Sequence, residues 1–492
     1  MTKFPTPSID WAALSPELIL LGGAAVCLLV PLFLPHGWRR HFCAFVSILS
    51  FVGAGAAAIA LFQMDETATA IVADAINRDR LAELAQVLIA GSGLLAVGVS
   101  YAYVLRERMG EYYTLLLAAA AGMCFFVAAN NLMTMFLGLE WFSISLYILC
   151  AIAIEKPASL EAGLKYLIVG SFGSGILLFG CALVYGATGE LGFTSIQQAT
   201  GADDPLFVTG MAMILAGLGF KVSAAPFHMW TPDVYQGAPT TVTSFMAAAT
   251  KVAGLALMVR ILVTAFPEQS EIWTIAVAVL AIASLAIGNL AAIAQSDVKR
   301  MLAYSSVSHA GFLLIAVAAN SEEGATALLY YFVPYAAATV GAFAVVAARE
   351  REQRRPVTLG SLEGLGWERP FLGVGMWVFV LSMAGFPLTG GFLGKLFVFS
   401  AIYEAGWWWL VVIGVLATAL SLAYYLSIVR ALFMRQGDEP LPTGVVAAGG
   451  SPPRDLLLDA TVAAAMVVTI GSFFFVQPLV DVARDAAASL PF

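Results

Sequence analysis

The sequence predicts an all-α polytopic membrane protein with about fourteen transmembrane helices. Hydrophobic residues make up 60% of the 492 residues, charged residues make up 11%, and the mean hydropathy is +0.88. A soluble domain carries about 25% charged residues. The net charge of −8 comes mostly from acidic residues in loops, and no nucleic-acid partner is indicated.

Apolar stretches of about 20 residues define the expected helices in order. They cover residues 16–34, 41–62, 82–105, 112–128, 131–154, 159–187, 207–230, 240–265, 272–294, 299–318, 325–348, 371–404, 407–433 and 456–477. The fourth and fifth are separated only by Asn130 and Asn131. The twelfth is too long for one straight span and contains GFPLTGGFLGK, so we expect one broken helix there. The connections near 188–206, 349–370 and 434–455 are rich in Gly, Pro and charge, which predicts ordinary loops.

We expect one membrane domain over residues 1–492, with a weak internal repeat. Helices four to eight and nine to thirteen would form two inverted five-helix repeats. The expected divisions are 1–111 for three N-terminal helices, 112–265 for the first repeat, 272–433 for the second repeat and 434–492 for a C-terminal helix.

Two interrupted helices suggest this repeat. Helix seven contains Lys221 and is broken at Pro226, and helix twelve contains Lys395 and is broken at Pro387. Because they are the seventh and the twelfth helices, an odd number of steps separates them, and they cross the membrane in opposite directions. Interrupted helices at matching places in two inverted halves indicate a transport site.

The loop charges predict the orientation in the membrane. Loops after odd-numbered helices carry fifteen positive residues, which are Arg39, Arg40, Arg106, Arg108, Lys156, Lys299, Arg300, Arg349, Arg351, Arg354, Arg355, Arg369, Arg430, Arg435 and Arg454. The other side carries five, which are Lys3, Arg78, Arg80, Arg260 and Arg484. Since cytoplasmic loops carry an excess of Lys and Arg, we expect both termini on the outer side.

The remaining four of the 24 Lys and Arg residues are lysines inside apolar stretches, namely Lys165, Lys221, Lys251 and Lys395. A charge at the centre of a bilayer costs about 2.5–3.5 kcal/mol. Such residues face a polar interior that usually carries ions or protons. A lysine removed from water gives up its proton more readily, so it can exchange protons near neutral pH.

The densest polar stretch surrounds the break in helix seven. Pro226 has no N–H, so the carbonyl of Val222 loses its helical partner and can bind water or a side chain. Lys221, this carbonyl, His228 and Lys251 would form a proton relay. The competing interpretations are that Lys221 snorkels or caps the break, and that His228 caps the broken helix.

Glu140 lies in an apolar helix, where a lone carboxylate should be neutral or paired. Its nearest partner along the sequence is Lys165 on the next helix. Such a pair would control how readily a neighbouring lysine keeps its proton. The alternatives are a static ion pair between two helices and a Lys165 that snorkels to the cytoplasmic face.

Two further residues are relay candidates. His309 follows Ser305, Ser306 and Ser308, whose hydroxyls could line a water path or simply allow close helix packing. Lys395 follows several glycines that allow unwinding and close approach. The tryptophans at 407–409 mark the membrane interface beyond it, so Lys395 would be the last relay residue before the outer face.

The five cysteines predict no redox centre in this chain. They are Cys27, Cys43, Cys124, Cys150 and Cys181, and no two are spaced as CxxC. Metal and iron–sulfur ligation needs closely spaced, convergent ligands. We therefore expect free cysteines in the core, and no metal or cofactor site.

Three segments resemble a known family. FKVSAAPFHMWTPDVYQGAP, DVKRMLAYSSVSHAGF and GFPLTGGFLGKLFVF are similar to segments of the antiporter-like subunits of NADH:quinone oxidoreductase (respiratory complex I) and of related cation/proton antiporters. The likeness spans helices four to thirteen. A lysine on helix twelve, fourteen helices and the lack of a long C-terminal extension resemble the N-type branch. M-type subunits usually carry glutamate at that lysine, and L-type subunits usually continue into a lateral helix.

The resemblance assigns relay roles to residues on five helices and after one break. Glu140 matches the glutamate of helix five, and lysines of helices six, seven, eight and twelve match Lys165, Lys221, Lys251 and Lys395. His228 matches the histidine after the break in helix seven. These residues would translocate protons.

The resemblance also implies partners and a location. NADH oxidation and quinone reduction would take place in other subunits and would drive proton translocation through this chain. Those subunits would hold FMN, the iron–sulfur clusters and the quinone. The neighbours would be the M-type subunit, the lateral helix of the L-type subunit, small membrane subunits and phospholipids, in a bacterial inner membrane with both termini periplasmic. The alternatives are an M-type subunit, a stand-alone cation/proton antiporter and a purely structural membrane subunit.

Overall fold

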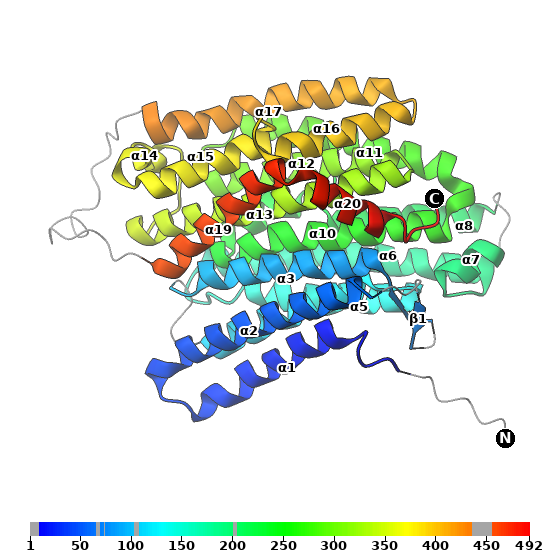
Figure 1. The fold of residues 1–492 in the computed structure, drawn as a ribbon, viewed down its shortest axis with the longest axis horizontal. Helices are drawn as coiled ribbons and strands as arrows, with labels where there is room; N and C mark the ends of the chain where they lie inside the picture. Colours follow the sequence, from blue (N-terminus) through cyan, green and yellow to red (C-terminus); the bar gives the residue numbers. More distant parts are fainter. Residues whose placement is uncertain (1–8, 65–68, 73, 103–107, 200–203, 435–454) are drawn as a thin grey trace.

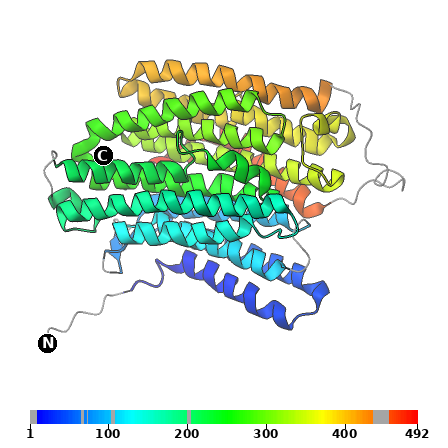
Figure 2. The same cartoon turned by 180° about the vertical axis from the view of Figure 1, so that it is seen from behind.

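The structure is a computed structural model that describes residues 9–64, 69–72, 74–102, 108–199, 204–434 and 455–492. Its helices lie side by side in one bundle. The helices α1 (Ser15–Leu29) and α2 (His36–Phe62) follow one long edge, and α17 (Trp408–Met434) follows the opposite edge (Figures 1 and 2). Within these residues, twelve helices are long and apolar enough to cross a membrane, and two shorter apolar helices accompany them. The all-α polytopic fold is confirmed.

The N-terminal part adds a short hairpin to the three expected helices. Its remaining elements are η1 (Val30–Phe33), β1 (Thr69–Ile71), β2 (Ile76–Arg78) and α3 (Arg80–Ser100). The strands pair antiparallel, with Ala70 opposite Asn77. Asp79 begins α3 by accepting a hydrogen bond from the backbone N–H of Ala82.

Asp79 also holds a buried arginine from a distant helix. Its Oδ1 accepts a hydrogen bond from Arg260 Nη2 at 2.7 Å, and a second bond joins the same two side chains. The sequence interpretation grouped Arg260 with the charges of the outer loops, but Arg260 is only 2% exposed. The guanidinium can lie inside the protein because this carboxylate neutralises it.

The first half of the bundle contains the expected helices and one extra short one. The elements are α4 (Met109–Val127), α5 (Leu132–Cys150), α6 (Pro157–Thr188), α7 (Phe193–Ala199), α8 (Pro205–Lys221), α9 (Trp230–Gly237) and α10 (Thr240–Ala265). The separation of α4 from α5 is confirmed, because the side chain of Asn131 accepts a hydrogen bond from the N–H of Thr134 and caps α5. The short α7 lies in a predicted loop.

The second half repeats this pattern of long helices with one break. The elements are η2 (Pro267–Gln269), α11 (Ser270–Ile293), α12 (Val298–Ala318), α13 (Glu322–Gln353), η3 (Gly360–Leu362), α14 (Leu365–Glu368), α15 (Pro370–Ala384), α16 (Gly390–Glu404) and the α17 named above. The breaks predicted at Pro226 and Pro387 are present between α8 and α9 and between α15 and α16. Ser223 and Leu388 take left-handed backbone angles in these two breaks.

The C-terminal segment differs from the single helix expected over residues 456–477. It forms α19 (Leu456–Phe474) and α20 (Val476–Ala487), which meet near the middle of the bundle (Figure 1). Pro478 lacks the N–H that would bond to the carbonyl of Phe474, so the helix cannot continue straight. The loop expected near 434–455 falls almost wholly outside the described residues.

The core lies around three helices. The apolar window of α10 is 100% buried, and those of α12 and α13 are 94% buried, against 33% for α2, α17 and α19. The outer helices turn large apolar side chains such as Phe172 outward, as a lipid-facing surface does. Polar groups on α10, α12 and α13 are therefore held inside protein.

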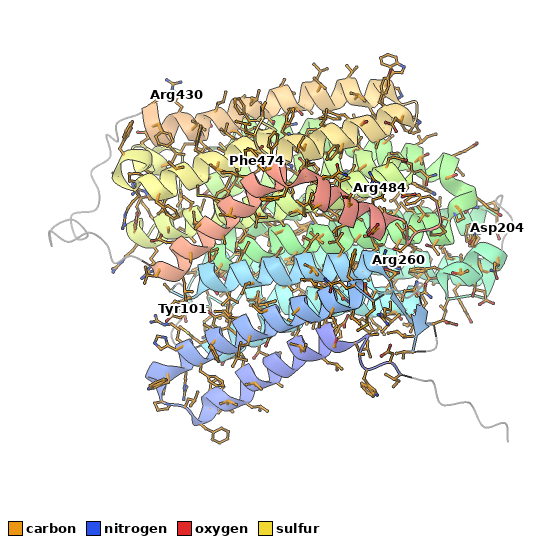
Figure 3. The ribbon with its side chains drawn as sticks, in the orientation of Figure 1. Tyr101, Asp204, Arg260, Arg430, Phe474 and Arg484 are labelled. Atoms are coloured by element: carbon orange, nitrogen blue, oxygen red, sulfur yellow. The ribbon has the colours of Figure 1, made fainter. Side chains whose placement is uncertain are left out.

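The two ends of the bundle carry different residues. Figure 3 places Tyr101 and Arg430 at one end, and Asp204, Arg260 and Arg484 toward the other. This arrangement agrees with the two sets of charges derived from the sequence. The assignment of the ends to the two sides of the membrane remains a prediction, as does the inverted symmetry of the two repeats.

Candidate functional site

Three of the four lysines singled out from the sequence are buried in the bundle. Lys221 is 2% exposed, Lys251 is 0% exposed and Lys395 is 3% exposed. Lys221 ends α8 and Lys395 lies on α16, so two of the three stand beside helix breaks. Lys251 lies in the interior of α10 between them along the sequence.

Lys221 lies in a cage of hydroxyl and aromatic groups. Its Nζ donates to Ser143 Oγ at 2.5 Å and lies 3.5 Å from Tyr166 Oη. The same nitrogen lies 4.6 Å from the ring centre of Phe142. These contacts come from α5 and α6, so Lys221 faces the interior instead of snorkelling to a membrane surface.

Glu140 stands one turn before Ser143 on α5 and acts on Lys221 through its charge. No ion pair joins Glu140 to a lysine among the described residues, and its Oε1 has no hydrogen-bond partner there. Lys221 therefore contacts neutral groups directly, and the carboxylate of Glu140 acts on it from a longer distance.

The predicted pairing of Glu140 with Lys165 is wrong. The Lys165 side chain is 42% exposed, and its Nζ pairs with Glu161 at 2.7 Å and Asp233 at 2.9 Å. Asp233 also accepts from Arg300 at 2.6 Å. Glu161 lies four residues earlier on the same helix, and Asp233 lies on α9, so Lys165 belongs to a partly exposed cluster that does not include Glu140.

The break between α8 and α9 is closed by local hydrogen bonds. Trp230 Nε1 donates to the carbonyl of Phe220 at 3.2 Å, and Thr231 donates to Ser223 at 2.8 Å. His228 is half-buried beside the ring of Tyr304, with 6.4 Å between ring centres. No hydrogen bond or ion pair joins His228 to Lys221 or Lys251 within the described part of the chain. The relay expected across this break is therefore not assembled by direct contacts.

Lys251 occupies the most enclosed position of the set. It is wholly buried, and its Nζ has no hydrogen-bond partner among the residues that the structure describes. His309 on α12 is close enough to feel the charges of both Lys251 and Lys395. Both lysines therefore act on this histidine through their charge, without a direct contact among the described residues.

His309 is held by two tyrosine hydroxyls. Its Nδ1 lies 3.0 Å from Tyr331 Oη, and its Nε2 lies 3.1 Å from Tyr425 Oη. Tyr425 also contacts the hydroxyl of Ser305. Because these partners come from α13 and α17, the imidazole is fixed at the meeting point of three helices.

A third tyrosine connects this cluster to the central helix. Tyr335 on α13 donates to the carbonyl of Ala247 at 3.1 Å, and its hydroxyl lies 3.1 Å from Ser306 Oγ. Ala247 is one turn before Lys251 on α10. Ser305 and Ser306 therefore take part in side-chain hydrogen bonds, which favours the polar interpretation of this serine stripe over simple helix packing.

Lys395 folds back onto the end of the preceding half-helix. Its Nζ donates to the carbonyl of Ala384, the last residue of α15, at 3.2 Å. It lies 4.3 Å from the ring centre of Phe312. A positive charge at a helix C-terminus is favourable. A methyl group on Gly394 would come within 2.5 Å of the Tyr331 ring, so this glycine permits the close packing around the lysine.

The sequence interpretation missed the tyrosines and Asp233. Tyr331 and Tyr335 are four residues apart on one apolar helix, and both are buried. Two hydroxyls at this spacing share one helix face, which was a usable signal. Tyr425 and Asp233 had no such pattern, because their importance depends on helices distant in sequence.

The five cysteines are all buried and unpaired, as expected. Within the described residues, no group of three or more His, Cys, Asp and Glu side chains could hold a metal ion. The buried polar groups around the relay candidates include lysine, histidine, tyrosine and serine side chains.

Helices broken at buried lysines around a polar core define an antiporter-like polytopic membrane protein. Residues 129–421 match the family described as NADH:quinone oxidoreductase/Mrp antiporter, TM. The chain belongs to the family of NADH-quinone oxidoreductase subunit N, as its relatives show. The subunit N of Trichlorobacter lovleyi is 40% identical over 88% of this chain and 89% of its own length. That of Paramagnetospirillum magneticum is 36% identical over 98% of both chains.

Solved structures agree with this assignment. A chain of respiratory complex I from Thermus thermophilus is 33% identical, with a TM-score of 0.80, over 95% of this chain and 99% of its own. A chain of the Mrp complex from Dietzia sp. DQ12-45-1b has a TM-score of 0.86 over 97% of both chains, at 23% identity. The second likeness shows a shared fold.

Proposed function

We propose that this chain is a proton-translocating, antiporter-like subunit of a bacterial NADH:quinone oxidoreductase. The observation that carries the proposal is the set of three buried lysines, with His309 within electrostatic reach of two of them. Isolated charges inside a membrane protein are costly and mark ion or proton pathways. The relatives named above support the assignment to this complex.

The residues divide the work of moving a proton. Lys221, Lys251 and Lys395 would each bind and release protons, because a buried lysine can exist in neutral form. Glu140 would favour the charged form of Lys221 at one stage of the cycle. His309 would pass protons between Lys251 and Lys395, since its two nitrogens contact separate hydroxyls.

Lys165 and His228 take secondary places in this proposal. Lys165 lies in an ion-pair cluster with Asp233 and Glu161, where it could bring protons toward the bundle. His228 would need a water or a side-chain movement to reach a lysine. Both remain candidate relay residues.

The proposed surroundings follow from the family. NADH, FMN, the iron–sulfur clusters and the quinone would belong to partner subunits, and this chain would contribute no redox centre. The neighbours would be the M-type subunit, the lateral helix of the L-type subunit and small membrane subunits. The chain would lie in the inner membrane with both termini periplasmic, and Lys395 in the outer half.

The likeness to the Mrp chain supports a second candidate, a stand-alone cation/proton antiporter. Purification in a gentle detergent separates the two proposals. A large assembly with NADH:quinone activity and coupled proton uptake supports the first. A chain that is isolated without such partners, and exchanges cations for protons in vesicles, would replace it with the second.

The proposed orientation has its own test. A reporter fused after Phe492 should behave as periplasmic, because the loops with more positive charge belong in the cytoplasm. A matched fusion after Arg430, at the opposite end of the bundle, should behave as cytoplasmic. The reverse pattern would show that the chain is inserted the other way.

A further inference from the structure

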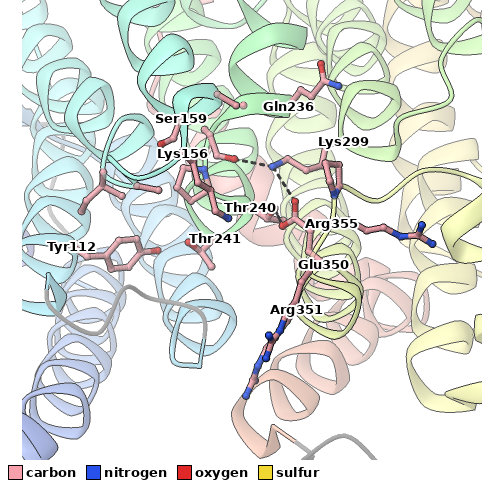
Figure 4. A pocket seen from close by; sticks show the side chains of 18 of the residues that line it. Tyr112, Lys156, Ser159, Gln236, Thr240, Thr241, Lys299, Glu350, Arg351 and Arg355 are labelled. Carbon is pink, nitrogen blue, oxygen red and sulfur yellow. Dashed lines mark hydrogen bonds and ion pairs between the residues drawn. The ribbon is translucent and has the colours of Figure 1, made fainter. Parts of the chain in front are cut away.

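A pocket opens at the end of the bundle where α6 and α10 begin and α13 ends. Its volume is about 600 Å³. Figure 4 shows side chains from several helices converging on it, among them Tyr112, Lys156, Thr240 and Lys299. None of the relay residues described above lines this pocket, so its function is a separate question.

The pocket lining is strongly basic. Its six positive residues are Arg108, Lys156, Lys299, Arg351, Arg354 and Arg355. Among the described lining residues the acidic one is Glu350, which pairs with Lys299 at 3.7 Å. Two more carboxylates stand at its edge, where Glu155 pairs with Arg108 at 3.8 Å and Asp455 pairs with Arg351 at 3.2 Å. Basic residues still outnumber acidic ones, and such an excess of positive charge attracts anions.

The buried wall of the pocket is already organised. Lys299 Nζ donates to the carbonyl of Ala238 at 2.8 Å, and Glu350 accepts from Thr240. Figure 4 draws the contacts of Lys299 with the Ala238 carbonyl and with Glu350 as dashed lines. They hold the lysine and glutamate in place, while Lys156, Arg351 and Arg354 remain exposed at the mouth.

Two helix starts line the same space. Helix α6 starts at Pro157 after Lys156, and α10 starts at Thr240 after Pro239. Neither start has a side-chain hydrogen-bond cap. In these two turns the N–H groups of Ser159 and Val242 bond to the carbonyls of Lys156 and Pro239. The earlier N–H groups, those of Ala158, Thr240 and Thr241, lie where a helix start favours anions.

A buried hydroxyl provides a further polar group. Tyr112 is 2% exposed, and the hydroxyls of Thr241 and Ser100 lie near its own without forming a well-aligned hydrogen bond. Figure 4 shows its hydroxyl turned toward Thr241 and the pocket. A phosphate oxygen or a bound water could satisfy this hydroxyl, which an empty apolar cavity could not.

Part of the lining is apolar. Ala102, Ile152, Ala153 and Pro356 contribute to the wall. An amphipathic ligand would place its charged group among the arginines and lysines and its less polar part against these residues. Basic pockets between transmembrane helices suit the headgroups of anionic phospholipids.

We propose that this pocket binds a phosphate-bearing anion, supplied by the headgroup of an anionic phospholipid in the adjacent leaflet. The net positive charge of the lining would neutralise the phosphate, and the first turns of α6 and α10 would donate backbone hydrogen bonds to its oxygens. The bound headgroup would tie the ends of α6, α10 and α13 together. This site goes beyond the proposed proton relay and does not depend on it.

Thiol labelling in lipid nanodiscs tests the proposal. Ala158 lines the pocket and is exposed, so Ala158→Cys places a small reporter there, and the five native cysteines are buried. The purified complex is reconstituted in phosphatidylcholine, in phosphatidylcholine with phosphatidylglycerol, or in phosphatidylcholine with inorganic phosphate. The rate of labelling by a neutral maleimide is measured in each. We expect phosphatidylglycerol to slow labelling, and phosphatidylcholine alone to leave it fast.

A double variant that removes two positive charges from the pocket tests the proposal more directly. Lys156→Gln with Arg354→Gln, both at the exposed mouth, should raise the phosphatidylglycerol content needed for protection about thirtyfold. The basis is that each basic residue near an anionic surface contributes about a factor of five in affinity. Arg430→Gln removes an exposed arginine at the same end but outside the pocket, and it should leave protection unchanged.

Each other outcome overturns part of the proposal. Equal labelling rates in all lipids, or protection that survives the double substitution, would show that the pocket binds no anionic headgroup. Protection by inorganic phosphate alone, with no added effect of phosphatidylglycerol, would assign the site to a free anion and reject the lipid. Assembly of every variant on a native gel confirms that the folded complex is being compared.

Discussion

The two helix breaks hold their lysines on opposite sides of the interruption. Lys221 ends the half-helix before its break, whereas Lys395 lies on the half-helix after its break. Lys221 reaches away to hydroxyls on α5 and α6, while Lys395 reaches back to the carbonyl of Ala384. A similar interruption thus gives two different lysine environments.

The difference indicates how each lysine could be controlled. Glu140 acts on Lys221 through its charge. No carboxylate lies within ion-pair distance of Lys395 in the described residues, and its charge acts on the imidazole of His309, which is held by Tyr331 and Tyr425. We infer that a carboxylate tunes the Lys221 site and that hydrogen bonds through the imidazole of His309 serve the Lys395 site.

The largest effect should come from Lys395. Lys395→Ala removes the amine, and Lys395→Arg keeps a positive charge that cannot lose its proton. We expect both to reduce redox-coupled proton uptake by about a hundredfold, at the lower end of what positioned acid–base groups contribute. Proton uptake per NADH in vesicles measures this, with assembly compared on a native gel. An arginine variant that pumps like the parent would mean that Lys395 contributes only charge.

Glu140→Gln should have the next largest effect, because it keeps the shape of the side chain and removes the charge that acts on Lys221. We expect about a tenfold loss of coupled proton uptake, equivalent to about 1.4 kcal/mol. Glu161→Gln is the matched control, since Glu161 is an exposed carboxylate that pairs with Lys165. Equal losses in the two variants would show that the charge of Glu140 has no special effect through Lys221.

Tyr425→Phe should have a moderate effect on the second site alone. It removes the hydroxyl that contacts His309 Nε2, and one hydrogen bond contributes about 1 kcal/mol, or about fivefold in rate. The adjacent Tyr424→Phe is the control, because Tyr424 bonds to Asn289 instead. If the Tyr424 variant loses as much coupled proton uptake as the Tyr425 variant, the contact with His309 is not the cause.

Asp233→Asn should have the smallest effect. It weakens partly exposed ion pairs with Lys165 and Arg300, and such pairs contribute about 0–1 kcal/mol. We expect a change of less than about fivefold in proton uptake. A loss as large as that of Glu140→Gln would instead give Lys165 and Asp233 a central place in the relay.

The sequence could predict the helices and the breaks because both follow from local chemistry. Apolar length sets where a helix can span, and a proline removes a backbone donor at Pro226 and Pro387. The burial of Lys221, Lys251 and Lys395 followed from the same argument. The break near Pro478 had the same local signal and was overlooked.

The partners of these residues could not be predicted in this way. Lys165 was assigned to Glu140 because the two helices are consecutive, but the rotation of α6 turns Lys165 toward Asp233 on α9. Likewise, Tyr425 meets His309 across 116 positions of sequence. Apolar periodicity says that a face is buried without saying which distant helix covers it.

The ion pair between Asp79 and Arg260 has a consequence for how the protein is made. The two residues are 181 positions apart in the chain. At about 5–20 residues per second, the ribosome adds Arg260 roughly 10–35 seconds after Asp79. Throughout that interval the start of α3 enters the membrane without its final counter-charge. The Asp79 carboxylate can therefore form its final ion pair only after the central helix α10 has been synthesised.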